Sequence, residues 1–156
     1  MKPNLGLSSK ARESVIDALA ILLADEHVLY VKARNFHWNV TGPHFGPLHA
    51  LFEQHYDALA ETIDEIAERI RSLGGIAPGS MAVFLKLARL AEDTGKPPKD
   101  SAMIAALLAD HEAIIRELRG AIELAGKHGD EGTADFLTGI LEAHEKTAWM
   151  LRAHLT

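Results

Sequence analysis

One segment of the sequence, from Phe45 to Leu73, constrains the fold more than any other. Its apolar residues recur near the spacing of an α-helix and no proline follows Pro47, so the segment is expected to form one long helix. The apolar positions are Leu48, Phe52, Leu59, Ile63, Ile66, Ile70 and Leu73. A helix with a long apolar face buries that face against other helices, which predicts a helical bundle.

Three further segments repeat the helical spacing. They run from a cap at Ser8 or Ser9 to before Gly42, from a cap at Asp100 or Ser101 to between Gly126 and Gly129, and from between Asp130 and Thr133 almost to the end of the chain. No strand pattern and no internal repeat accompanies them. The chain is therefore predicted to be all-α.

The stretch from Gly74 to Pro98 is long for a loop. Inside it, MAVFLKLARLAE has the pattern of a short amphipathic helix. A crossover of this length joins two parallel helices at opposite ends of a bundle, and ferritin-like folds have one such connection. We therefore expect a ferritin-like four-helix bundle with a short extra helix between its second and third long helices.

Length and composition limit the possible classes of protein. The 156 residues suit one domain, 1–156, in which 1–7 form an N-terminal arm because Pro3 and Gly6 oppose regular structure. The absence of cysteine fits a reducing compartment and excludes thiolate metal sites. The sequence shows neither a membrane span nor a signal peptide, which favours a cytoplasmic location and leaves nucleoid association open.

Five possible metal ligands lie between Asn35 and Gly74. They are His37, His49, Glu53, Asp64 and Glu68. The last four lie within about 100° of one another around the predicted helix, so they form one stripe. From His49 to Asp64, however, the helix rises about 22 Å, whereas the ligands of one ion each lie about 2 Å from it. One helix by itself does not close this site.

A two-fold axis does close it. The midpoint of His49 and Glu68 coincides with the midpoint of Glu53 and Asp64, and both lie at 58–59. An antiparallel copy of the helix that crosses there places each histidine-containing cluster opposite the carboxylates of its partner. Two equivalent sites result, as the self-complementary interface of a two-fold dimer requires.

The runs NFHWNVTGPHF, LHALFE and IDEIAERIRSLGG closely resemble the Dps family, mini-ferritins of twelve subunits that oxidise iron and protect DNA. The resemblance implies an iron site between subunits, with ligands at His37, His49 and Glu53 of one chain and at Asp64 and Glu68 of the other. It also implies a homododecamer built from two-fold dimers. Family members more often have Asp at the position of Glu53, which bears on metal affinity but still supplies an oxygen ligand.

Simpler interpretations exist for each of these residues. Asp64 and Glu68 would also suit a solvated acidic face paired with Arg69 and Arg71, and an isolated histidine on a helix is commonly a surface or core residue. The symmetric spacing of all five positions favours the metal site. A mixed histidine and carboxylate site with open positions suits Fe(II), although zinc also binds such ligands.

Trp38 and an acidic segment extend the resemblance. Trp38 has two possible roles, packing on the core or donating an electron when iron is oxidised. The segment GDEGTADFLTG resembles the start of the last Dps helix, where acidic side chains line pores at three-fold axes. The matching residues are Asp130, Glu131 and Asp135. Their alternative role is to oppose the helix dipole in a first turn.

Absent motifs exclude related sites. No Glu precedes a His by three residues, as it does in the di-iron carboxylate proteins that bind metal inside one bundle. The long second helix carries no Met to act as an axial ligand, so no haem is expected. We expect the remaining histidines to be surface or core residues; they are His27, His44, His55, His111, His128, His144 and His154.

These observations predict a ferroxidase, an iron-oxidising and iron-storing cage. The resemblance alone implies that its oxidant is hydrogen peroxide. DNA binding is expected to be weak, because Lys2, Lys10 and Arg12 are the only basic residues of the arm and the net charge is −6. Two rival hypotheses are a DNA-compacting nucleoid protein with a vestigial metal site and a monomeric helical adaptor with an acidic face.

Overall fold

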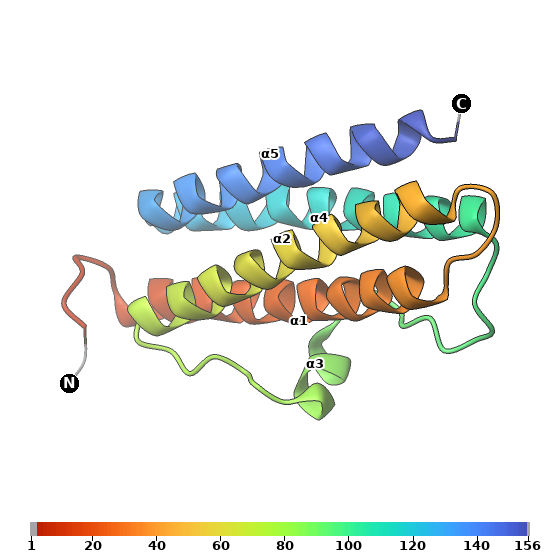
Figure 1. The fold of residues 1–156 in the computed structure, drawn as a ribbon. Coiled ribbons are helices and arrows are strands. Elements are labelled where there is room, and N and C mark those ends of the chain that lie inside the picture. Colours follow the sequence, from red (N-terminus) through yellow and green to blue (C-terminus); the bar gives the residue numbers. More distant parts are fainter. Residues whose placement is uncertain (1–2, 156) are drawn as a thin grey trace.

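Five helices make up the fold of residues 3–155, the part of the chain that the computed structural model describes. The helices are α1 (Ser9–Asn39), α2 (Phe45–Ser72), α3 (Met81–Leu87), α4 (Asp100–Lys127) and α5 (Glu131–Ala153). The four long helices form a bundle, in which α2 and α4 run parallel, while the short α3 lies outside against α1 (Figure 1). No strand occurs between residues 3 and 155. The predicted all-α, ferritin-like bundle with a short crossover helix is confirmed.

The turn between α1 and α2 forms where the sequence predicts it. The Ser8 side chain caps α1 by accepting a hydrogen bond from the backbone N–H of Ala11. At the other end, the extended backbone of Val40 stops the helix, and Gly42 takes a φ of 109° that a residue with a Cβ rarely adopts. The turn returns the chain antiparallel, so the end of α1 lies beside the start of α2.

The core lies between the four long helices. Phe36 of α1 and Phe52 of α2 are fully buried, and their ring centroids are 6.2 Å apart, so these rings join the two helices near the turn. All four long helices contribute further fully buried large residues; these include Leu19, Leu22, Leu23, Leu29, Ile66, Ile70, Leu73, Met103, Leu107, Ile114, Leu118, Leu137 and Leu151. The apolar stripe predicted for α2 therefore faces inward, which leaves its carboxylate stripe on the outside.

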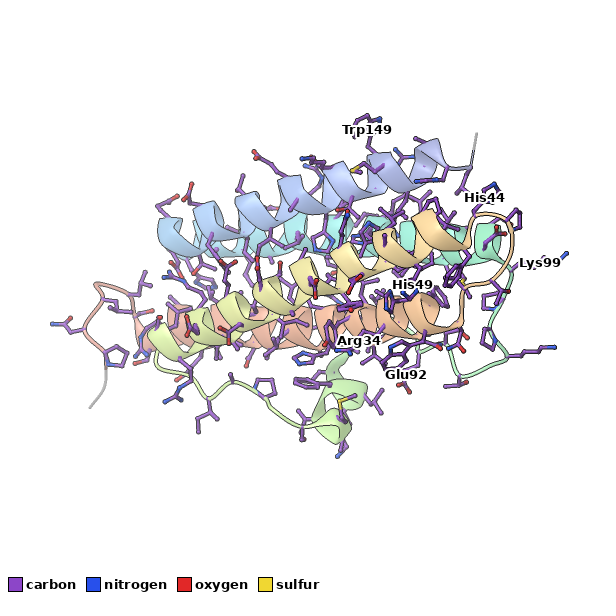
Figure 2. All side chains as sticks on the ribbon, in the orientation of Figure 1. Arg34, His44, His49, Glu92, Lys99 and Trp149 are labelled. Carbon is purple, nitrogen blue, oxygen red and sulfur yellow. The ribbon has the colours of Figure 1, made fainter. Side chains whose placement is uncertain are left out.

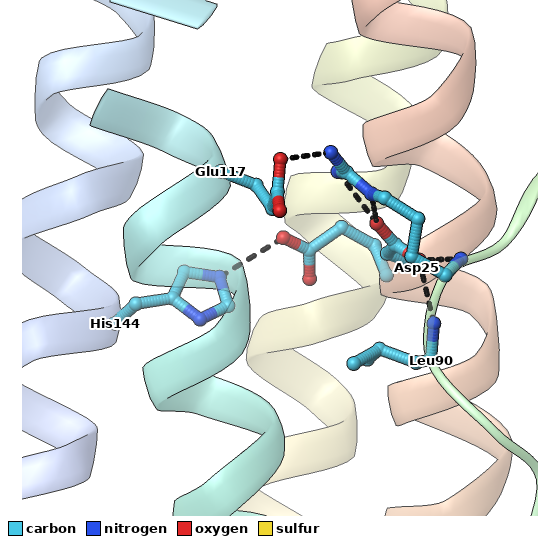
Figure 3. A network of polar contacts seen from close by, with 6 residues as sticks. Asp25, Leu90, Glu117 and His144 are labelled. Atoms are coloured by element: carbon cyan, nitrogen blue, oxygen red, sulfur yellow. Dashed lines mark hydrogen bonds and ion pairs between the residues drawn. The ribbon is translucent and has the colours of Figure 1, made fainter. Parts of the chain in front are cut away.

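Asp25 of α1 fixes the crossover. Its buried carboxylate accepts hydrogen bonds from the backbone N–H groups of Arg89, at 2.6 Å, and Leu90, at 3.1 Å, and from the Arg89 guanidinium (Figure 3). Arg89 also pairs with Glu117 of α4. The expectation that the crossover helix extends to Glu92 is wrong, because the chain leaves α3 at Ala88 and gives its next N–H groups to Asp25.

The expected cap of α4 is also displaced. Lys99 is the N-cap residue, and Asp100 lies within the first turn instead. The Asp100 carboxylate accepts from the backbone N–H of Ser101 and lies 3.1 Å from His44 Nδ1, so it links α4 to the turn before α2. The contact with His44 and the bond from Ser101 hold the pKa of Asp100 below its ordinary value.

The described part of the N-terminal arm lies against the far end of α2. A Cβ on Gly74, where φ is 90°, would lie only 2.7 Å from Pro3, so the close approach of the arm requires glycine there. Arg12 reaches the same corner and donates to the carbonyl of Leu73. Lys2, one of the basic residues predicted for the arm, lies outside the described residues. Across residues 3–155, no helix is both long and apolar enough to cross a membrane.

Candidate metal centre

His37 and His49 lock each other in place where α1 ends and α2 begins. The Nδ1 atom of each ring lies 2.8 Å from the backbone carbonyl oxygen of the other residue, and the rings stack with centroids 3.7 Å apart. Figure 2 shows His49 near the start of α2, facing α1. His37 is buried and His49 is half-buried. The structure thus brings together two predicted ligands that are twelve residues apart in the sequence.

This arrangement determines which ring nitrogens are free. A carbonyl oxygen only accepts hydrogen bonds, so Nδ1 of each ring carries the proton and donates it. In a neutral imidazole the other nitrogen, Nε2, then has a free lone pair. A hydrogen bond from the second nitrogen to a backbone carbonyl is a common way to orient a metal-binding histidine. Both rings are therefore prepared to bind a cation through Nε2.

Glu53 lies one turn after His49 and belongs to the same surface. Its carboxylate is exposed and accepts a hydrogen bond of 3.3 Å from the Tyr56 hydroxyl. Tyr56 also meets the edge of His37, at 5.2 Å between ring centroids, and lies below the Arg34 guanidinium. Burial, followed by the charge of Glu53, raises the pKa of Tyr56, so its hydroxyl stays protonated and donates.

Sequence reasoning missed Tyr56. The available signal was its spacing, because residues three and seven positions after Glu53 and His49 lie on the same side of a helix. Tyrosine is also common in amphipathic helices, so this spacing alone does not distinguish it from a packing residue.

Asp64 and Glu68 lie on the same exposed side of α2 but far from the two histidines. Both are exposed, and the predicted pairing with Arg69 and Arg71 does not form, because Arg69 pairs with Asp130 and Arg71 donates to the Gly75 carbonyl. Within residues 3–155 of one chain, no group of three His, Asp or Glu side chains is placed to hold an ion. The single chain therefore presents two separate halves of the predicted site.

Trp38 does not pack in the core of the chain. Its side chain is 64% exposed, beside the buried His37, and the Arg34 guanidinium carbon lies 5.2 Å from the centre of its ring. Figure 2 labels Arg34 on α1. The cation favours the electron-rich ring and opposes positive charge on it.

The acidic residues at the start of α5 have two different environments. Asp130 is only 4% exposed, caps α5 by accepting from the Thr133 N–H, and pairs with Arg69 at 2.9 Å. Glu131 and Asp135 are exposed. Asp130 thus has a structural role in the single chain, and Glu131 and Asp135 are the members of the predicted pore set that are free to meet a passing cation.

Three histidines expected to be surface or core residues meet inside the bundle. His55 of α2, His111 of α4 and His144 of α5 are all buried, and each interrupts an apolar stripe at core spacing. Burial, with a smaller effect of His154, lowers the pKa of His55 from 6.5 to about 4. Burial, followed by the charges of His144 and His55, holds the pKa of His111 well below 6.5. Both rings are neutral at physiological pH.

The buried rings predict acid sensitivity of the metal-free protein. A histidine whose pKa is lowered by folding is protonated first in the unfolded chain, so stability is present above pH 6.5 and is lost as the pH falls towards 4. His55 alone is expected to remove about 3 kcal/mol over this window. Urea unfolding in the presence of a chelator measures the loss. His55→Leu should flatten the dependence, whereas His44→Gln, at an exposed ring, should preserve it.

Comparison with known proteins places the chain in a class. The sequence model of the ferritin-like domain matches residues 16–156. A DNA protection during starvation protein of Bacillus anthracis is 41% identical over 92% of this chain and 97% of its own length. An uncharacterized low temperature-induced protein of Nostoc is 50% identical over 97% of this chain and 86% of its own length. The crystal structure of a Dps protein from Vibrio cholerae, described as a ferritin-like diiron-carboxylate protein, superimposes with a TM-score of 0.95 at 36% identity, covering 100% of this chain and 98% of that one.

The bundle and the matched domain define a ferritin-like protein. Within that class, the sequence and structural relatives agree, and the chain belongs to the Dps family.

Proposed function

We propose that the protein is a ferroxidase that oxidises Fe(II) with hydrogen peroxide and stores the product as a mineral inside a cage of twelve chains. Iron is the substrate. The observation that carries the proposal is the pair of histidines, His37 and His49, whose Nδ1–H groups are held by backbone carbonyls at 2.8 Å so that both Nε2 atoms are free.

The second half of the proposed site comes from a neighbouring chain. His37, His49 and Glu53 of one chain would bind iron together with Asp64 and Glu68 of the partner subunit. The separation of about 22 Å along α2 rules out closure within one helix, whereas a two-fold axis at 58–59 would join the halves. Ala58 is exposed at that point, and its small side chain permits the close approach of two crossing helices.

The proposed ligands suit the chemistry. Imidazole and carboxylate ligands bind Fe(II), and fewer protein ligands than coordination positions leave room for the oxidant. Two Fe(II) ions lose one electron each, and one hydrogen peroxide molecule accepts both electrons to give two hydroxide ions. We propose that Trp38 supplies an electron when a peroxide meets a single Fe(II), which limits release of the hydroxyl radical. The name diiron-carboxylate, given to a structural relative, supports iron over zinc.

Assembly mass and iron oxidation together test the proposal. Light scattering should give the mass of twelve chains, and the rate of Fe(III) formation under anaerobic conditions should rise when hydrogen peroxide is added. Glu68→Gln keeps the shape of the exposed side chain but removes its charge, so it should lose most of the rate and retain the mass. A variant with full activity would contradict the assigned site, and a monomeric mass would favour the adaptor hypothesis.

The exposed acidic residues at the start of α5 are proposed to guide iron into the cage. Glu131→Gln combined with Asp135→Asn should slow iron uptake at unchanged assembly mass, because an acidic path concentrates cations. Asp130 is left intact in this experiment because it caps α5 and pairs with Arg69. Uptake at the original rate would remove the pore from the proposal.

Relatives named for DNA protection favour DNA binding as a second candidate function. We propose that this binding is weak, because Lys10 and Arg12 of α1 are the only basic residues among those described before Glu13, and Arg12 is already bonded to the Leu73 carbonyl. Plasmid retardation should disappear by about 200 mM salt, as expected for a few phosphate contacts. Retardation that persists there, without iron oxidation, would favour a DNA-compacting protein with a vestigial metal site.

A further inference from the structure

Each long helix contributes one ionisable side chain to a cluster in the middle of the bundle. They are Glu26 of α1, His55 of α2, His111 of α4 and His144 of α5. Glu26 is fully buried, and the exposed fractions of the three rings are 9%, 3% and 4%. This cluster contains none of the ligands assigned to the ferroxidase site.

The cluster holds most of the unsatisfied polar atoms of the interior. Within residues 3–155, six buried side-chain nitrogen and oxygen atoms have no hydrogen-bond partner, and four of them are both carboxylate oxygens of Glu26, Nδ1 of His55 and Nε2 of His111. Buried polar groups are nearly always satisfied, so a concentration of exceptions calls for an explanation such as an ion. A buried carboxylate that contacts an imidazole but accepts no hydrogen bond favours a nearby cation.

The contacts of His111 and His144 indicate which of their ring nitrogens carry a proton. Glu26 Oε1 lies 3.0 Å from His144 Nε2, a contact drawn in Figure 3 that has the length of an ion pair but lacks hydrogen-bond alignment. A proton on Nε2 of His144 is favoured by the carboxylate, which leaves Nδ1 free. The Nδ1 atoms of His144 and His111 are 2.8 Å apart, so a single proton on His111 joins them.

One pair of rings has the centroid spacing of two ligands that share an ion, and a second pair lies about 1 Å beyond that spacing. With metal–nitrogen bonds of about 2.0 Å and tetrahedral angles, two ligating imidazoles place their ring centroids about 5 Å apart. The centroids of His111 and His144 are 4.8 Å apart, and those of His55 and His111 are 6.0 Å apart. Two nitrogens on one tetrahedral ion lie about 3.3 Å apart, so the 2.8 Å contact must open by about 0.5 Å. In the structure, among residues 3–155, the rings are not yet in ligand positions.

A cavity beside the three rings supplies space for an ion and its ligands. A cavity of about 60 Å³ is lined by all three histidines and by small and hydroxyl side chains of α2 and α5, namely Ala58, Thr62, Ala143 and Thr147. A water molecule needs only about 10–15 Å³ of such space, so the cavity holds a fourth, water ligand beside an ion. The three nitrogens and one water complete four-coordination, the number that zinc prefers.

We propose that His55, His111 and His144 form a second metal site, inside the bundle, for a divalent ion of borderline softness such as Zn²⁺. The ion takes the place of the proton between the two Nδ1 atoms. That proton moves to Nε2 of His111, and the resulting N–H group donates a hydrogen bond to water in the cavity. Glu26 is a positioning residue that orients His144 and offsets the charge of the ion, as carboxylates do beside many zinc-binding histidines.

The site is tested in a protein in which the three exposed carboxylates of the proposed ferroxidase site are neutralised. The background variant carries Glu53→Gln, Asp64→Asn and Glu68→Gln, so that zinc titration by calorimetry reports chiefly on the interior of the bundle. We expect one Zn²⁺ per chain and, with Co²⁺ as the probe, the intense visible absorption of a four-coordinate ion. No zinc binding by the folded background protein overturns the proposal, and this outcome leaves the proposed ferroxidase function untouched.

Variants of the cluster separate this site from adventitious surface binding. In the background protein, Glu26→Gln should weaken zinc binding by about 10- to 100-fold and shift the Co²⁺ spectrum, because the orienting carboxylate is lost. His111→Leu should abolish binding, whereas the control His44→Gln, at an exposed ring, should leave affinity and spectrum unchanged. If His111→Leu does not fold, Glu26→Gln decides. Affinity and spectrum unchanged in Glu26→Gln, or in a folded His111→Leu, refute the site.

Discussion

A refolded mixture of His49→Ala and Asp64→Ala chains should recover roughly a quarter of the wild-type rate of iron oxidation, although each variant alone should be inactive. In a pure variant, every proposed site lacks one ligand. In a mixed dimer, one site lacks both ligands, while the other takes His49 and Asp64 from the two unmutated positions. Random pairing makes about half of the dimers mixed, and half of their sites are complete.

The structure makes this experiment informative. Asp64 is exposed and His49 is half-buried at a helix start, so neither truncation opens the core. Mass spectrometry confirms that mixed assemblies form, and equal amounts of the two pure variants, mixed without unfolding, serve as the control. Mixed assemblies as inactive as their parents would refute a site shared between chains. A site within one chain predicts that outcome.

Asp25→Ala should detach the crossover from the bundle and lower the free energy of unfolding by about 3 kcal/mol, because hydrogen bonds to a charged group each contribute about 1.5–3 kcal/mol. The carboxylate accepts from two backbone N–H groups of the crossover and from the Arg89 guanidinium. Urea unfolding at one fixed protein concentration measures the loss. Limited proteolysis should then cut the crossover between α3 and α4 first.

A matched control separates the tether from the ion pair on the surface. Glu117→Gln removes the negative charge that pairs with Arg89. The Arg89 side chain is 39% exposed, and an exposed ion pair contributes only about 0–1 kcal/mol to the free energy of unfolding. This variant should therefore keep both the stability and the protection of the crossover. Equal losses in the two variants would show that Arg89, and not the backbone contact with Asp25, holds the crossover in place.

The turn between the first two long helices shows how much local sequence predicts. The cap at Ser8, the stop before Gly42 and the start at Phe45 all lie where the sequence places them, because a cap, a glycine and a proline act on their own neighbours. The inward stripe of α2 was equally predictable, because periodicity by itself separates the buried side of a helix from the exposed side. The stripe containing His49 and Glu68 follows from the same periodicity.

Contacts between helices determined the features that local sequence did not predict. The end of α3 depends on Asp25, which lies more than sixty residues earlier in the chain, so no local pattern reveals it. The reciprocal hydrogen bonds of His37 and His49 likewise depend on the angle at which α2 passes α1. Trp38 shows the same dependence, since its neighbours in sequence do not tell whether a bulky ring turns towards the core or towards solvent.

The buried histidines show most clearly what the sequence by itself did not determine. From the sequence alone, His55, His111 and His144 were expected only to be surface or core residues. Their convergence on Glu26 was decided only by the tertiary structure. Helical periodicity sets the direction of a side chain around its own axis, whereas the level at which four helices meet depends on how their side chains interlock along the bundle.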